Sequence, residues 1–215
     1  MKTTTLAAAF GLALSAMLVP AAAHADGKTA GDLLFRARAL DVRPQESSRI
    51  TPIGGSIEAS NTVVPEIDAT YFLTDNIAFE VIAATTEHDM KANGTSSGNL
   101  NLGKVSLLPP TLTAQYHFMP KSSFSPYLGA GVNYTWFYDA TAPGGTVYNV
   151  GYKDNFGTVL QAGFDYQIDG RWYLNVDVKQ IFLHTDAAVN SGAINASVDL
   201  DPLLIGAGLG YRFSL

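Results

Sequence analysis

Eight segments of this chain alternate apolar and polar side chains with a period of two, the pattern of β-strands that have two different faces. In one of them Leu128 and Val132 share a face, while Gly131 and Asn133 share the opposite one. The predicted strands are residues 32–43, 63–73, 76–88, 111–119, 127–138, 156–168, 172–183 and 203–213. The pattern therefore predicts an all-β fold.

The lengths of the strands and of their connections predict where this fold resides. Most predicted strands have about 10 to 13 residues, which suits a strand tilted across a bilayer better than the usual five or six. Short turns alternate with long polar connections, and the long ones are residues 44–62, 89–110, 139–155 and 184–202. Aromatic residues gather near both ends of the strands, as in interfacial belts. We expect an eight-stranded antiparallel up-and-down transmembrane β-barrel with both termini in the periplasm.

The first 25 residues have the features of a cleaved secretory signal peptide. Lys2 is followed by the uncharged apolar stretch 6–19 and by the small-x-small sequence Ala23-His24-Ala25. The apolar stretch is shorter than the roughly 20 residues of a spanning helix. We therefore expect residues 26–215 to form one mature domain, inserted in the outer membrane of a bacterium.

Composition excludes several classes of function. The chain has no cysteine, which excludes disulfides, thiol catalysis and cysteine-ligated zinc. Without Lys2 the chain keeps 12 basic and 19 acidic residues, a net charge of −7, so it lacks the basic surface of a nucleic-acid-binding protein. We expect neither a nucleic-acid partner nor a cofactor.

Nine charged residues share the strand faces opposite the apolar ones. On the lipid-facing side such charges would cost about 2–4 kcal/mol at mid-bilayer, so we expect them inside the barrel. They are Arg36, Arg38, Glu66, Asp68, Glu80, Asp165, Asp177, Lys179 and Arg212. Because their signs nearly balance, an ion-pair network that fills the lumen is favoured over a charged path for a polar solute.

One long connection carries unexpected apolar side chains followed by two prolines. Leu100, Leu102, Val105, Leu107 and Leu108 either form the rim of an apolar vestibule or extend the fourth strand above the membrane, and the sequence favours neither. Pro109 and Pro110 cannot donate hydrogen bonds to a ladder, and Pro65 is a second interruption of this kind. We expect a gap in the barrel wall at these prolines, through which an apolar solute leaves sideways into the bilayer.

Two histidines raise the alternative of a lipid-modifying enzyme. His88 and His184 lie near strand ends and have acidic neighbours, but neither has a serine beside it in a catalytic pattern. Successive strand residues alternate faces, so Glu87, His88 and Asp89 cannot converge on a metal ion. Catalysis is therefore the least favoured function, below a surface receptor or a structural barrel without transport.

The sequence also resembles a known family along nearly all of the predicted mature chain. The similar stretches are TYFLTDNIAFEVIAAT (70–85), LLPPTLTAQYHF (107–118), SPYLGAGVNYTWFYD (125–139), RWYLNVDVKQI (171–181) and LDPLLIGAGLGYRF (200–213). In order and spacing they resemble the outer membrane protein W (OmpW) family. The resemblance implies a narrow apolar pore for passive uptake of small hydrophobic molecules. The expected partners are outer-membrane lipid and lipopolysaccharide, small apolar solutes, and the barrel assembly machinery during biogenesis.

Overall fold

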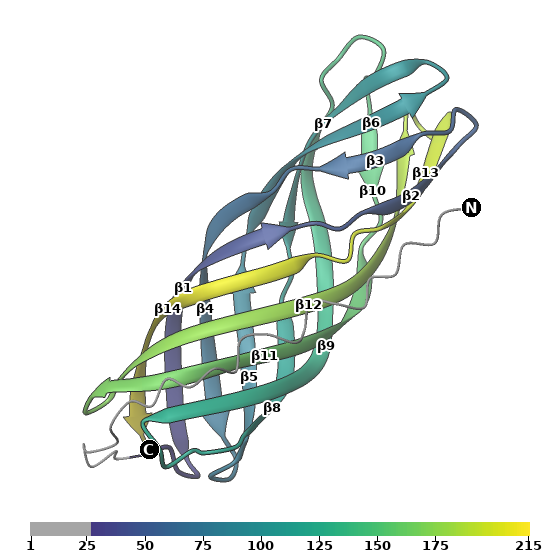
Figure 1. Cartoon of the computed structure of the whole chain (residues 1–215). Coiled ribbons are helices and arrows are strands. Elements are labelled where there is room, and N and C mark those ends of the chain that lie inside the picture. Colours follow the sequence, from purple (N-terminus) through teal and green to yellow (C-terminus); the bar gives the residue numbers. More distant parts are fainter. Residues whose placement is uncertain (1–26) are drawn as a thin grey trace, which may run out of the picture.

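A computed structural model describes residues 27–215, so the predicted signal peptide lies outside the described residues. Eight strands form a closed antiparallel barrel in the order β1-β4-β5-β8-β9-β11-β12-β14, and β14 pairs back onto β1 (Figure 1). The strands of this ring are β1 (Asp32–Arg43), β4 (Thr62–Phe72), β5 (Ile77–Ala84), β8 (Thr111–His117), β9 (Phe124–Thr141), β11 (Asn155–Asp169), β12 (Trp172–Val189) and β14 (Leu203–Ser214). Closure gives every strand two neighbours, as hydrocarbon requires.

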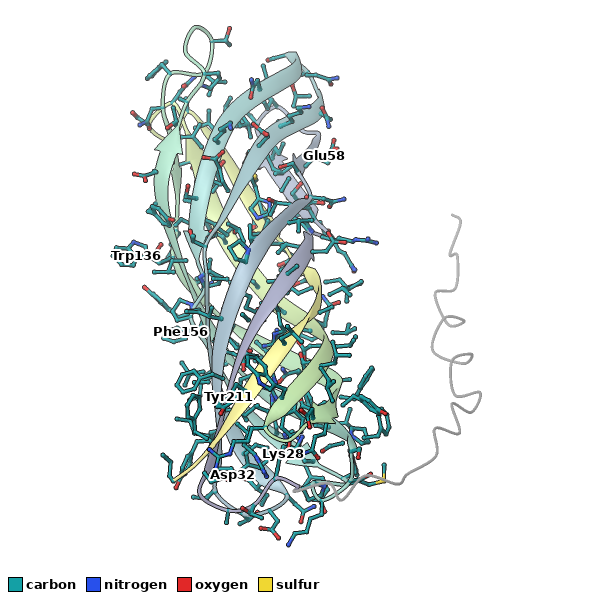
Figure 2. All side chains as sticks on the ribbon, turned by 90° about the vertical axis from the view of Figure 1, so that its left-hand side faces the viewer. Lys28, Asp32, Glu58, Trp136, Phe156 and Tyr211 are labelled. Atoms are coloured by element: carbon teal, nitrogen blue, oxygen red, sulfur yellow. The ribbon has the colours of Figure 1, made fainter. Side chains whose placement is uncertain are left out.

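The ring has apolar side chains outside and polar side chains inside. Phe35, Leu128 and Val132 are exposed on its outer face, and their neighbours Arg36 and Asn133 are buried. Figure 2 shows Trp136 and Phe156 pointing away from the barrel wall. A surface of this kind would aggregate in water and suits contact with lipid. Among the described residues no helix is long and apolar enough to cross a membrane.

The long connections were predicted as loops, and this prediction is wrong for much of their length. They contain β2 (Ser47–Thr51), β3 (Ser56–Ala59), β7 (Gly98–Leu108), β10 (Val150–Tyr152), β13 (Ile194–Asp199) and most of β6 (Thr86–Thr95), whose first three residues belong to the predicted strand 76–88. These six strands pair with one another and with the long strands β9 and β12, so the wall continues beyond the ring at one end (Figure 1). We call this part the extension.

The polarity of the wall inverts between the ring and the extension, as a single strand illustrates. Along β12 the inward-facing Lys179 is followed by the inward-facing Ile181 and Leu183. On the outer face of the same strand, exposed Phe182 is followed by exposed His184. The extension thus has an apolar interior and a polar exterior, like a protein in water, while the ring has the reverse. The interior changes from charged to apolar where the two parts meet.

Candidate functional site: an apolar cavity above a charged lumen

A cavity of about 70 Å³ lies at the junction of the ring and the extension. Strands of both parts contribute its apolar wall, which includes Leu40, Ile82, Met90, Val105, Leu107 and Leu183. These side chains lie on the inner face of the wall, because side chains along a strand alternate between its two faces. Their strands belong to the ring, to the extension or to both. The sequence therefore builds an apolar chamber whose wall is a β-sheet.

An ion pair forms the polar end of this chamber. Lys179 Nζ lies 3.0 Å from Glu66 Oε1, and both residues line the cavity. Lys179 also lies 2.8 Å from Asp177 Oδ1, and Arg38 Nε lies 2.7 Å from Glu66 Oε1. These contacts connect the end of the chamber to the charged groups deeper in the ring.

All nine charged residues predicted to face inward are buried inside the barrel. Arg36 contacts Asp68 at 2.8 Å and Asp165 at 3.0 Å, while Arg38 contacts Asp68 at 2.7 Å and Glu80 at 3.0 Å. Arg212 Nη1 lies 3.4 Å from Asp32 Oδ2. These ion pairs lie inside the ring, on the side of the cavity away from the extension.

Two further buried charged groups, Lys28 and Asp32, were missed, and Lys28 precedes the first predicted strand. Its Nζ lies 2.7 Å from Asp165 Oδ2, and the rings of Phe72 and Tyr173 lie 5.7 and 5.4 Å from it. Figure 2 shows Lys28 and Asp32 near the end of the barrel opposite the extension. A lone lysine outside any periodic segment gives no signal that it is buried, so only the fold reveals this contact.

The apolar residues predicted as a vestibule lie on strand β7 and divide between two spaces. Val105 and Leu107 line the cavity together with Pro109, while Leu100 and Leu102 line a smaller apolar space farther into the extension. Leu108, Pro110 and Pro65 line neither space. Leu107 and Leu108 are neighbours on a strand and point to opposite faces, so only Leu107 reaches the cavity.

Pairing in the wall is interrupted near the prolines. The β4–β5 ladder ends at Glu66–Ala84, next to Pro65, although β1 remains paired to β4 as far as Thr62. On β9, pairing with β8 ends at Asn133 and pairing with β7 begins at Trp136, which leaves Pro109 and Pro110 between the two ladders. A backbone hydrogen bond from Tyr134 N to Pro110 O at 3.1 Å bridges that gap, together with two side-chain bonds from Asn133 Nδ2, to Pro109 O at 3.1 Å and to Pro110 O at 3.4 Å.

Tyr152 is a further cavity residue that sequence reasoning missed. It lies on the short strand β10, lines both the cavity and the smaller space above it, and stacks on Phe137 with ring centroids 5.5 Å apart. Its hydroxyl oxygen is buried and has no hydrogen-bond partner among residues 27–215. This burial raises the pKa of the Tyr152 hydroxyl above its usual range, so it stays protonated.

The two histidines singled out in the sequence have different surroundings. His88 lines the cavity, and its Nδ1 lies 2.6 Å from Ser60 O while its Nε2 lies 3.2 Å from Thr86 Oγ1. Burial lowers the pKa of His88, so the ring is held neutral. In residues 27–215 no group of three or more His, Asp or Glu side chains has the arrangement of a metal site.

His184 instead lies on the exposed outer face of the extension, in an arrangement that its sequence neighbours did not indicate. Its Nδ1 lies 2.7 Å from Asp199 Oδ1, and its Nε2 lies 3.3 Å from Ser197 Oγ and 3.5 Å from Asp186 Oδ1. The register of β12 and β13 brings these residues together, as in a serine–histidine–aspartate triad. An oxyanion hole needs free N–H groups, whereas both edges of β13 are paired, with β12 and with β2. His184 thus forms ion pairs with Asp186 and Asp199 on the open surface of the extension.

Comparison with known proteins gives the family context of this geometry. The OmpW family model matches residues 29–213. "Outer membrane protein W" of Vibrio cholerae is 35% identical over 216 residues, which cover 94% of this chain and 97% of that protein. An "uncharacterized outer-membrane protein" of Sinorhizobium fredii is 41% identical over 221 residues, covering 98% of this chain and 95% of the relative. The crystal structure of the outer membrane protein OprG from Pseudomonas aeruginosa matches with a TM-score of 0.79 at 28% identity, covering 88% of this chain and 99% of that one.

Proposed function

This chain belongs to the OmpW family of outer-membrane β-barrels, and we propose that it is a channel for passive uptake of small hydrophobic molecules. The observation that carries the proposal is the apolar cavity, which ends on the Glu66–Lys179 pair. A polar solute gains nothing from such a chamber, whereas an apolar one gains about 25 cal/mol for each Å² that it removes from water.

The proposed path begins outside the cell and ends in the bilayer. The extension faces the outside, and the short turns and both termini face the periplasm, as is usual for barrels of this kind. Below the cavity, the ion-pair network of Arg36 and Arg38 blocks a straight path through the ring. A solute in the cavity therefore leaves sideways, through the interrupted wall beside Pro65 and Pro109–Pro110.

The position of the interruptions supports a lateral exit. Glu66, Ala84 and Pro109 all line the cavity and also border the places where ladder pairing stops. An open stretch of wall is tolerated at membrane depth only where its polar groups find other partners. The bonds from Asn133 Nδ2 and from Tyr134 N to the proline carbonyls provide such partners on one side of the gap.

A comparison of two tracers tests this function. Uptake of a small apolar tracer and of a polar tracer of similar size is measured across outer membranes with and without the protein. We expect faster passage of the apolar tracer only, lost in Leu107→Asp and retained in Leu108→Asp, a matched change at the neighbour that does not line the cavity. Equal passage of both tracers would indicate a wet pore, and passage of neither a receptor or a structural barrel.

We further propose that the protein has no catalytic role. His88 is neutral and has both ring nitrogens engaged, and His184 lies among two carboxylates on an open surface. A lipid-modifying activity requires a nucleophile with a base and a stabilised oxyanion in one pocket. Release of fatty acid or of modified lipid by the purified protein would contradict this part of the proposal.

A further inference from the structure

We propose that the solute of this cavity is a single-ring aromatic molecule with one hydrogen-bonding oxygen, recognised by the hydroxyl of Tyr152. This inference rests on the proposed function and specifies its substrate class. A phenol or an aromatic aldehyde has this chemistry, whereas a plain hydrocarbon lacks the oxygen.

The hydrogen bonds of the cavity wall single out Tyr152. The other polar side chains that line the cavity are engaged with each other, with the side chain of Asn133 or with backbone carbonyls, and they are Glu66, Thr86, His88, Thr111, Thr135, Lys179 and Thr185. The hydroxyl of Tyr152 is the exception, since it is buried and lacks a partner within residues 27–215. A buried hydroxyl that no protein group satisfies is stabilised by a bound molecule that supplies the missing hydrogen bond.

The rings of Phe137 and Tyr152 favour an aromatic solute. Their planes differ by 18° and their centroids are 5.5 Å apart, so the two rings form one stacked pair in the wall. Both line the cavity, and a third ring placed against them adds an aromatic contact as well as buried area. Other residues of the cavity wall are aliphatic, including Val198 and Leu200. They contact the apolar part of the solute.

The position of Tyr152 allows it to select solutes before they reach the exit. Tyr152 and Val198 line both the cavity and the smaller apolar space in the extension, so they lie at the boundary between the two. A solute that moves from the extension toward the interrupted wall passes these two residues. Tyr152 therefore contacts it on the way in.

The cavity is smaller than the space that one aromatic ring occupies. The volume is about 70 Å³, which is below the roughly 150 Å³ of a dry cavity that holds benzene. Side chains must therefore move to admit even a single ring. Met90 in the wall has a flexible thioether side chain that adapts readily, but a fused-ring solute would need a much larger rearrangement.

Two fluorinated probes of similar shape test the inference. 4-Fluorophenol and 4-fluorotoluene are titrated by 19F NMR against the full barrel in lipid nanodiscs, and partition into empty nanodiscs is subtracted. We expect 4-fluorophenol to bind about 3- to 10-fold more tightly than 4-fluorotoluene, which corresponds to the net contribution of one hydrogen bond. In Tyr152→Phe this preference disappears while 4-fluorotoluene binding stays the same, because only the hydroxyl is lost. Tyr148→Phe, the same change on an exposed tyrosine, keeps the preference.

The outcomes separate this inference from the proposed function. Equal binding of both probes to the unmodified protein, or a phenol preference that survives in Tyr152→Phe, overturns the role of the hydroxyl and leaves uptake of apolar solutes intact. Binding of neither probe, together with no passage of the apolar tracer, overturns both. The rates of uptake of the two probes by cells carrying either variant provide a second readout that needs no purified protein.

Discussion

Lys28 Nζ lies 2.7 Å from Asp165 Oδ2 inside the barrel, although 137 residues separate the two in the sequence. Asp165 also accepts hydrogen bonds from Nε and Nη2 of Arg36, each at 3.0 Å. A single carboxylate thus joins the segment before β1 to a strand on the other side of the ring. Because all three side chains are fully buried, the arrangement depends on their mutual neutralisation.

Asp165→Asn should lower the free energy of unfolding by about 3–5 kcal/mol, because Lys28 and Arg36 would lose the carboxylate that they share. Urea unfolding of the barrel in lipid vesicles, followed by tryptophan fluorescence, measures the change. Asp75→Asn is the matched control, since Asp75 pairs with Lys121 at the same distance of 2.7 Å on the surface. We expect no measurable effect there, and equal effects of the two variants would contradict the claim that burial makes the difference.

Gly208→Ala should impair closure of the barrel, whereas Gly206→Ala should be tolerated. A Cβ on Gly208 would lie 2.0 Å from the carbonyl oxygen of Ala37 on the paired strand, and backbone cannot give way there. A Cβ on Gly206 would first meet Cδ of Arg38, at 3.3 Å. The folded fraction of each variant in vesicles, read from its gel mobility without heating, distinguishes the two. Equal folded fractions of the two variants would show that the pairing of β1 with β14 has room for a Cβ at Gly208.

The ring could be predicted from the sequence because its alternation is regular over whole strands. The predicted strand 32–43 coincides with β1, and the inward face of Arg36 and Arg38 followed from the same alternation. Resemblance to the OmpW family, noted from the sequence, is confirmed over residues 29–213. The outer-membrane barrel is confirmed by similarity to solved structures of this class.

The extension and part of the site were not predictable by the same means. Residues 86–88 were predicted as the end of a strand, but in the stretch 89–95 only Met90 and Ala92 are apolar and face inward, too few to mark a strand. The contacts of Tyr152 and Lys28 join segments far apart in the chain, and the Ser197–His184 contact depends on the pairing of β12 with β13. Alternation along a strand predicts which face of the sheet a residue occupies. It does not predict which residue of the neighbouring strand pairs with it.

Replacing Pro109 and Pro110 by Val and Thr should slow the uptake of an apolar tracer. The new N–H groups allow the ladders of β7 and β8 along β9 to join, which closes the wall beside the cavity. Pro126→Val is the control, because Pro126 lies near the start of β9, at the end of the ring away from the cavity. We expect several-fold slower passage in the double variant and unchanged passage in the control. Unchanged passage in both would exclude this part of the wall as the exit.

The exposed His184 cluster should make the β12–β13 pair sensitive to pH. The hydrogen bond to Asp199 raises the pKa of His184 above its usual value of 6.5, and Asp186 contributes in the same direction. A pKa raised by folding means that the stabilisation is fully present below the unfolded pKa and is lost as the pH rises through the folded one. The pairing of β12 with β13 should therefore loosen above that pH.

An NMR titration of the His184 ring checks this expectation. Asp199→Asn should bring its pKa back toward 6.5, because the largest contribution is removed. Ser197→Ala should leave the pKa nearly unchanged, since the Ser197 hydroxyl at 3.3 Å carries no charge. Hydrogen exchange of the β13 amides at pH values on either side of the measured pKa then reports the loosening itself. A pKa that stays the same in Asp199→Asn, or exchange that does not depend on it, would show that the cluster is only a solvated surface group.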